Sequence, residues 1–347
     1  MNKTLLNKAY KNIFTPGENY IQTGYEDLDS LLSGCTKGSL ITIGGRPAMG
    51  KTTFSMNLLE QFLTQGKKCL YFTYNIPAER FMQRLIIQYA EISLTRTILK
   101  HFTNEDIKNL SNAKNAIEKW DLHICNEKLT DAASIDNLIK KIKPDYVFID
   151  AIQDICIEKV TIRHFARRLK KLIKDTKLNS EEVVAINKIL DWLPLPWEFT
   201  APQRATDISI EKINERFCNI DFPYHYEYYN PFIEICLENI IMDYIAKHLK
   251  IIAKKYDTVI FVNSELKKAP VLRKSYYPKL NDLDAPQSLA KASDIVMMFY
   301  RKEYYNSDLA ENEKNIMEVH FVKPFNVMID FSFKNLNIRN HRISNQN

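Results

Sequence analysis

The sequence has 347 residues, of which 45% are hydrophobic and 26% charged, and its formal net charge is +6. This length and composition predict an ordinary globular protein with a sizeable core, built as one large domain or two smaller ones. The modest positive charge permits a polyanionic partner without requiring one.

The cysteine and hydropathy patterns argue against a secreted, disulfide-bonded or membrane-spanning protein. The six cysteines form no C-x-x-C pair, so we interpret them as buried free thiols of a reducing compartment. No apolar run approaches the ~20 residues that span a bilayer. The N-terminus also lacks the apolar core of a signal peptide. We therefore expect a cytoplasmic protein.

The first elements along the chain lead into a glycine-rich loop. Residues 1–20 hold only a short helical pattern, which we interpret as a linker or as a docking helix for a neighbouring subunit. A second short helix ends at Gly34. Residues 39–43 predict a buried strand, and residues 53–62 predict an amphipathic helix.

The loop between that strand and that helix fits the phosphate-binding pattern G-x-x-x-x-G-K-[ST]. Its glycines allow backbone N–H groups to converge on phosphates, and the following helix adds the positive end of its dipole. Lys51 would reach the β- and γ-phosphates, and the Thr52 hydroxyl would bind Mg²⁺. All eight glycines of the chain lie between Gly17 and Gly66, which argues against a chance match. The expected ATP-binding residues are Gly45, Arg46, Pro47, Ala48, Met49, Gly50, Lys51, Thr52 and Thr53.

Strands and helices alternate after the loop and predict a doubly wound, mostly parallel α/β sheet. The predicted strands are residues 68–74, 122–125 and 146–150, and the predicted helices are residues 78–92, 104–120 and 134–142. Thr103 begins a capping pattern at the second of these helices. Asp150 ends an apolar strand at the edge where such sheets bind ligands, so we interpret it as a Mg²⁺ carboxylate. The alternative for Asp150 is an ordinary turn residue.

The stretch 158–240 is interpreted as an insertion that contains a possible duplication. A basic helix followed by a buried strand occurs at residues 166–188 and again at residues 246–264. This pair is either a duplicated unit, whose first copy could add an edge strand, or a coincidence in a lysine-rich chain. The aromatic and proline-rich residues between the copies suit nucleic-acid stacking, but they suit a small subdomain core or a protein-binding face at least as well.

The order of motifs resembles the motor domain of DnaB-type replicative helicases, which has a RecA-like P-loop fold. Thr23-Gly24-Tyr25-Glu26-Asp27-Leu28-Asp29 is similar to the family's T-G-x-x-x-L-D motif, and GGRPAMGKTT at residues 44–53 is similar to its A-R-P-S-M-G-K-T loop. Ile149-Asp150-Ala151-Ile152-Gln153 is similar to I-D-Y-L-Q. Tyr300 to Tyr305 and Lys323 resemble the late Y-R-D-x-Y-Y and K-Q-R-N-G segments.

The resemblance implies an ATP-driven DNA helicase of replication that works as a ring or filament and lacks the family's primase-engaging N-terminal domain. It divides the core into residues 21–157 and 241–336, followed by a tail at 337–347. Arg301 would lie near the adenine or a neighbouring subunit. A loop after the sensor strand would contact single-stranded DNA through Lys267, Lys268, Arg273, Lys274 and Tyr276, although a basic stretch alone is usually a solvated face.

Three departures from the family pattern affect hydrolysis. Asn75 replaces the catalytic glutamate, and an amide can orient water but cannot take its proton. Glu265 replaces a neutral glutamine that senses the γ-phosphate, and Phe325 replaces the arginine finger. Glu79 or Arg339 are conceivable substitutes.

Two functions therefore remain open from the sequence. The intact loop and motif order favour a helicase or translocase that uses Lys51, Asp150, Asn75 and Glu265 at its ATP site. The three departures favour an ATP-binding relative that hydrolyses slowly or not at all and acts as a nucleotide-gated scaffold on DNA or a replication protein. An ATPase acting on a protein is a weaker third possibility.

Overall fold

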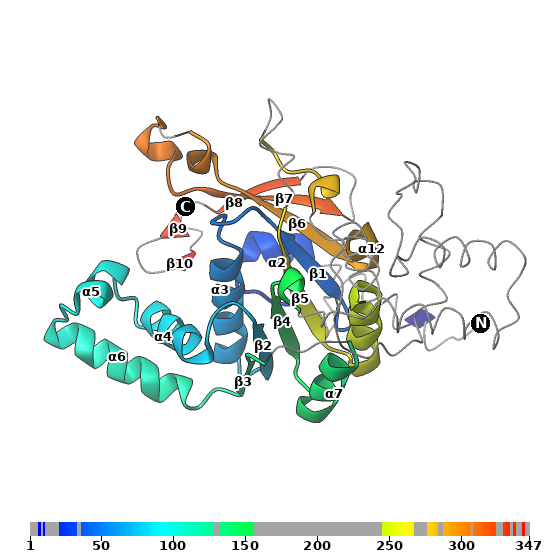
Figure 1. The fold of residues 1–347 in the computed structure, drawn as a ribbon, viewed down its shortest axis with the longest axis horizontal. Helices are drawn as coiled ribbons and strands as arrows, with labels where there is room; N and C mark the ends of the chain where they lie inside the picture. Colours follow the sequence, from blue (N-terminus) through cyan, green and yellow to red (C-terminus); the bar gives the residue numbers. More distant parts are fainter. Residues whose placement is uncertain are drawn as a thin grey trace, which may run out of the picture. The chain divides into compact units, whose positions relative to one another are not determined.

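The structure is a computed structural model, shown as a ribbon in Figure 1. It describes residues 6–7, 10, 21–32, 36–127, 132–155, 245–266, 276–283, 287–306, 308–323, 329–333, 336–337 and 342–343. The predicted insertion at 158–240, including the first copy of the possible duplication, lies outside these residues. The domain boundaries therefore stay predictions.

An eight-stranded sheet in the order β3-β2-β4-β5-β1-β6-β7-β8 forms the centre of the described chain. The first six strands in this order run parallel, and β7 and β8 continue the sheet antiparallel. The doubly wound, mostly parallel sheet predicted from the sequence is confirmed. The strands are β1 Leu40–Gly44, β2 Cys69–Thr73, β3 Leu122–Cys125, β4 Tyr146–Asp150, β5 Val259–Ser264, β6 Ile295–Tyr300, β7 Met317–Lys323 and β8 Ile329–Phe333.

The parallel strands are continuous apolar runs because helices cover both of their faces. Every residue of β1, β2, β5 and β6 is buried. The strand register aligns the carboxyl ends of β1, β2, β4 and β5. Gly44 of β1 pairs with Ser264 of β5, and Thr73 of β2 pairs with Asp150 of β4. The residues that follow these four strands therefore meet along one edge of the sheet.

Helices α2 (Glu26–Leu32), α3 (Lys51–Thr64) and α4 (Ala78–Tyr89) pack into the main core cluster on one face. Phe62 of α3 stacks on Tyr146 with ring centroids 3.7 Å apart. Helix α12 (Gln287–Ala292) covers the opposite face of β1, where the hydroxyls of Thr42 and Ser293 are 2.7 Å apart. On that side, α7 (Ala132–Ile142) and a helix at residues 245–256 lie side by side, joined by an ion pair between Lys255 and Asp136 (Figure 1).

Several predicted helix ends are wrong. The helix expected over 78–92 ends at Tyr89, because Glu91 adopts a left-handed φ of 56° that breaks the helix. A separate helix, α5 (Leu94–Leu99), follows it and was not predicted. Helix α6 (Asn104–Ile117) stops three residues before the predicted Trp120. Its predicted start is confirmed, because Thr103 and Asp106 form a capping box.

Short elements complete the described chain. They are the 3₁₀ turns η1 Ile152–Asp154, η3 Leu280–Asp282, η4 Lys302–Tyr304 and η5 Glu311–Glu313, and a two-stranded sheet of β9 Leu336–Asn337 and β10 Arg342–Ile343. Within the described ranges, no helix is both long and apolar enough to cross a lipid bilayer.

Candidate nucleotide-binding site

The loop between β1 and α3 is a tight turn in which the backbone passes close to its neighbours. A Cβ added at Gly45 would lie 3.3 Å from Lys51 Cγ and 3.3 Å from Phe299 Cβ. Gly50, directly before α3, has φ 96°, a conformation that favours glycine. At both positions of the predicted phosphate loop, a residue with a side chain would therefore be crowded or strained, and glycine is not.

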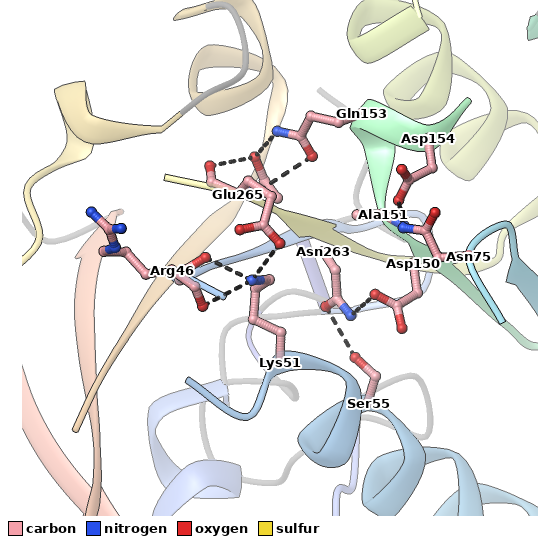
Figure 2. A network of polar contacts seen from close by, with 12 residues as sticks. Arg46, Lys51, Ser55, Asn75, Asp150, Ala151, Gln153, Asp154, Asn263 and Glu265 are labelled. Carbon is pink, nitrogen blue, oxygen red and sulfur yellow. Dashed lines mark hydrogen bonds and ion pairs between the residues drawn. The ribbon is translucent and has the colours of Figure 1, made fainter. Parts of the chain in front are cut away.

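Lys51 is the most enclosed charge of this loop, with only 7% of its side chain exposed. Its Nζ donates to the backbone oxygens of Gly45 at 2.7 Å and Arg46 at 3.2 Å. The same Nζ lies 2.8 Å from Glu265 Oε1 (Figure 2). A buried ammonium needs such compensation. The Glu265 carboxylate supplies the negative charge that a phosphate group would also supply.

Asp150 is fixed by a chain of hydrogen bonds that connects α3 with the sheet. Asn263 Nδ2 donates to Asp150 Oδ1 at 2.8 Å, and Ser55 Oγ donates to Asn263 Oδ1 at 3.0 Å. The Tyr71 hydroxyl donates to Asp150 Oδ2 at 3.0 Å. Burial, then the charge of Asp150, raises the pKa of Tyr71, so that this phenol remains a donor. The Asp150 carboxylate is thereby oriented before any ligand arrives.

A second network orders the segments that follow β4 and β5. Gln153 Nε2 donates to Ser264 Oγ at 3.0 Å, and its Oε1 accepts from the Glu265 N–H at 3.2 Å. Asn75, after β2, donates from its side-chain amide to Asp154 Oδ2, which also accepts from the Ala151 N–H at 3.2 Å. Figure 2 shows Lys51, Glu265, Asp150, Asn75 and Asp154 along the same edge of the sheet.

The residues of this edge fit a phosphate-bearing ligand. No side chain caps the N-terminus of α3, so its first N–H groups are available to an anion. Within the described chain, Arg46 Nε and Nη1 are buried without a hydrogen-bond partner. Arg301 Nη1 donates to the Ala48 oxygen at 3.1 Å, and its Nη2 pairs with Glu303. The unpartnered nitrogens of Arg46, close to an uncapped helix start, favour a polyanion.

A metal ion would need ligands from the nucleotide as well as from the protein. Among the described residues, no three histidine, cysteine, aspartate or glutamate side chains converge on a metal position. Mg²⁺ commonly takes only one or two protein ligands and completes its shell with phosphate oxygens and water. Thr52 and Asp150 fit that minimal role.

The structure brings together only part of the predicted site. Lys51 and Glu265 are in contact, Asp150 is linked to α3, and Asn75 contacts Asp154. Thr52 and Thr53 are half-buried at the start of α3, Met49 is buried, and Pro47 and Ala48 are exposed. The predicted DNA-contacting residues Lys267, Lys268, Arg273 and Lys274 lie outside the described residues, as do Phe325 and Arg339.

Tyr276, a predicted DNA contact, and Glu79, a conceivable substitute for the catalytic glutamate, both lie within the described residues. Tyr276, expected at the DNA surface, is 38% exposed and stacks on Tyr305 with ring centroids 4.5 Å apart. Glu79, a conceivable substitute base, is exposed on α4 and accepts a hydrogen bond from Gln83 at 3.4 Å. No contact joins Glu79 to Lys51, Asp150 or Asn75 among the described hydrogen bonds and ion pairs.

Several residues of the two networks have no role that the sequence predicts, chiefly Ser55, Tyr71, Gln153, Asp154 and Asn263. Asn263 carried a usable signal, because it is a polar residue near the carboxyl end of an apolar strand, as Asp150 is. Asp154 lies in a short turn and carried none. Its role depends on a contact with a residue 79 positions away.

A family model described as the DnaB-like helicase C-terminal domain matches residues 20–189 and 238–332. The replicative DNA helicase DnaB of Buchnera aphidicola subsp. Acyrthosiphon pisum (strain APS) is 26% identical over 302 residues, which cover 86% of this chain and 50% of the relative. DnaB of Geobacillus stearothermophilus is 24% identical over 308 residues, which cover 88% of this chain and 52% of the relative. The chain thus spans about half the length of these relatives.

Solved structures share the fold. One of them, described as an ATPase domain, has a TM-score of 0.69 at 19% identity, and the match covers 100% of this chain and 99% of that one. A DnaB-like replicative helicase, described with its interactions with primase, has a TM-score of 0.68 at 19% identity, with 100% and 67% coverage. The predicted RecA-like α/β fold is confirmed.

Proposed function

Because this chain belongs to the DnaB-like helicase C-terminal domain family, we propose that it is an ATP-driven motor that acts on DNA during replication. One observation carries the proposal. The buried Lys51 ammonium is held among two loop carbonyls and the Glu265 carboxylate, which together provide the oxygen environment that a nucleotide phosphate would replace. A buried ammonium needs oxygen acceptors around it, and phosphate oxygens would supply them in place of these groups.

Different residues at this edge of the sheet would bind the phosphates and the Mg²⁺ ion. The N–H groups at the start of α3 and the Lys51 ammonium would bind the phosphates. Thr52 and Asp150 would hold Mg²⁺, which would neutralise phosphate charge during the transfer. Asn263 and Tyr71 keep the Asp150 carboxylate in place by donating to its two oxygens.

The expected macromolecular partners are single-stranded DNA and further copies of this chain. The net charge of +6 supports attraction to a polyanion. Two cations beside the loop, Arg46 and Arg301, each keep at least one guanidinium nitrogen without a partner within the described residues. A ring or filament is the assembly that the family relationship supports.

The decisive experiment is steady-state ATP hydrolysis with and without single-stranded DNA, with Lys51→Ala as the background. We expect DNA to stimulate turnover several-fold and Lys51→Ala to abolish it. Mg·ATP binding is measured in parallel by equilibrium titration. Tight binding with turnover no faster than that of Lys51→Ala would exclude a motor and leave a nucleotide-gated scaffold.

A further inference from the structure

Hydrolysis requires a group that takes a proton from the attacking water, and Asn75, an amide, is not such a group. Its side-chain nitrogen instead donates to Asp154 Oδ2. The same oxygen accepts from the Ala151 N–H at 3.2 Å. Oδ1 of Asp154 has no hydrogen-bond partner among the described residues and is left to accept a proton.

The other carboxylates of the edge, Asp150 and Glu265, offer no oxygen that is both unpaired and accessible. Both oxygens of Asp150 accept hydrogen bonds, from Asn263 and Tyr71. Glu265 Oε1 is paired with the Lys51 ammonium at 2.8 Å, and its Oε2 is buried, so neither oxygen is open to an incoming water. Glu79 points to Gln83 on the exposed side of α4. Asp154 is therefore the carboxylate with a free acceptor atom next to Asn75.

We propose that Asp154 is the general base of ATP hydrolysis in this chain, and that Asn75 is a positioning residue that holds its carboxylate toward the attacking water. This inference rests on the proposed ATP hydrolysis. It assigns the proton-accepting role to a turn residue after β4, with the amide after β2 as its support.

The local environment suits this role. Burial, with additional repulsion from Asp150 and Glu265, raises the pKa of Asp154, although the hydrogen bonds from the Ala151 N–H and the Asn75 side chain act in the opposite direction. A raised pKa makes a carboxylate a stronger base, closer to the working pH. The 3₁₀ turn η1, which the Ala151–Asp154 bonds close, fixes the backbone that carries the group.

The chemical step balances with water as the only added reactant. The water oxygen forms a bond to the γ-phosphorus, and the bond from that phosphorus to the β,γ-bridging oxygen breaks. The bridging oxygen keeps the electron pair and leaves with ADP. The proton of the water passes to Asp154 Oδ1 and from there to solvent.

Asp154→Asn is the first test, because the amide oxygen can still accept from Asn75 and Ala151, so the turn is preserved. We expect kcat for ATP to fall about 100-fold or more, the range of general-base contributions, with Mg·ATP affinity and thermal midpoint unchanged. Asn75→Ala should lower kcat about tenfold with no change in the same affinity. Glu79→Gln is the matched control, a carboxylate-to-amide change that should leave kcat within twofold.

The outcomes separate this inference from the proposed function. Turnover by Asp154→Asn at the unmodified rate would overturn the assignment while the motor function stands. So would a loss of turnover in Glu79→Gln or Glu265→Gln while Asp154→Asn stays active, because the base would then lie elsewhere. An unmodified chain that does not exceed the Lys51→Ala background would overturn both proposals.

Discussion

At the scale of single residues, Lys51 has two possible counterions. Its ammonium is paired with Glu265 Oε1 at 2.8 Å, and the second oxygen of that carboxylate is buried with no hydrogen-bond partner among the described residues. A bound phosphate would have to compete with this carboxylate, and both anions cannot approach the ammonium without repelling each other. We therefore expect Glu265 to oppose nucleotide binding.

Glu265→Gln should tighten Mg·ATP binding about tenfold, which corresponds to about 1.4 kcal/mol. The amide still offers Lys51 an oxygen but no longer repels phosphate. Equilibrium titration with a fluorescent ATP analogue measures the change. Glu118→Gln is the control, because it removes the carboxylate of an exposed Lys114–Glu118 pair on α6 and should leave the affinity within twofold. Weaker binding by Glu265→Gln would show that the carboxylate assists the nucleotide.

The nucleotide loop could be predicted from the sequence because its chemistry depends on adjacent residues. The pattern from Gly45 to Thr52 specifies a turn, a helix start and a lysine within a single stretch. Asp154 could not be predicted in the same way. Its significance arises from its contact with Asn75, and that contact depends on β2 and β4 lying next to each other in the sheet.

At the scale of elements, α6 begins with a complete capping box. Thr103 Oγ1 accepts from the Asp106 N–H at 3.1 Å, and Asp106 Oδ2 accepts from the Thr103 N–H at 2.9 Å. The carboxylate of Asp106 also contacts Arg96 of α5 at 3.1 Å. One side chain thus anchors both the start of α6 and the preceding helix.

Thr103→Ala should lower the free energy of unfolding by about 1 kcal/mol, since the Asp106 N–H would lose its acceptor. Urea denaturation monitored by circular dichroism measures this change. Ser111→Ala is the matched control, because Ser111 is exposed in the middle of α6 and alanine is the better helix former there. Equal stability of the Thr103→Ala variant and the unmodified chain would contradict the role of the cap.

Helix starts were more predictable than helix ends in this chain. The start of α6 is marked in the sequence by the capping residues Thr103 and Asp106. The end of α4 instead depends on the left-handed backbone of Glu91, although glutamate normally favours a helix. The apolar Ile92 continues the helical spacing beyond that point, although it belongs to a separate buried cluster with Ala90 and Ala113. Tertiary packing decided the boundary.

At the scale of the whole molecule, residues from distant parts of the chain lie along the edge of the sheet that carries the proposed nucleotide site, here called the nucleotide edge. Strands β1, β2, β4 and β5 bring Lys51, Asn75, Asp150 and Glu265 to one edge, although more than 200 residues separate the first from the last. The alternation of strands and helices predicted the parallel sheet and the position of this edge. The antiparallel β7 and β8 were not predicted, because the residues of a strand do not encode whether it runs parallel or antiparallel to its neighbour.

A ligand bound at this edge should stabilise the native fold, because binding favours the folded state over the unfolded one. At a Mg·ATP concentration 100 times its Kd we expect about 2.7 kcal/mol of added stability and a higher thermal midpoint. The shift should disappear in Lys51→Ala, measured by differential scanning fluorimetry. Thr64→Ala, at the far end of α3, serves as the control and should keep it. A full shift in Lys51→Ala would place the nucleotide elsewhere.

The confinement of glycine to residues 17–66 has a consequence for engineering this chain. Later turns adopt left-handed backbone with ordinary side chains, at Glu91, Lys100, Lys143, Asp257 and Asn315. Such a conformation costs roughly 1 kcal/mol for a residue that carries a Cβ. None of these positions belongs to the nucleotide edge. Thermostability can therefore be adjusted by substitutions at these turn positions while the residues of the nucleotide edge stay unchanged.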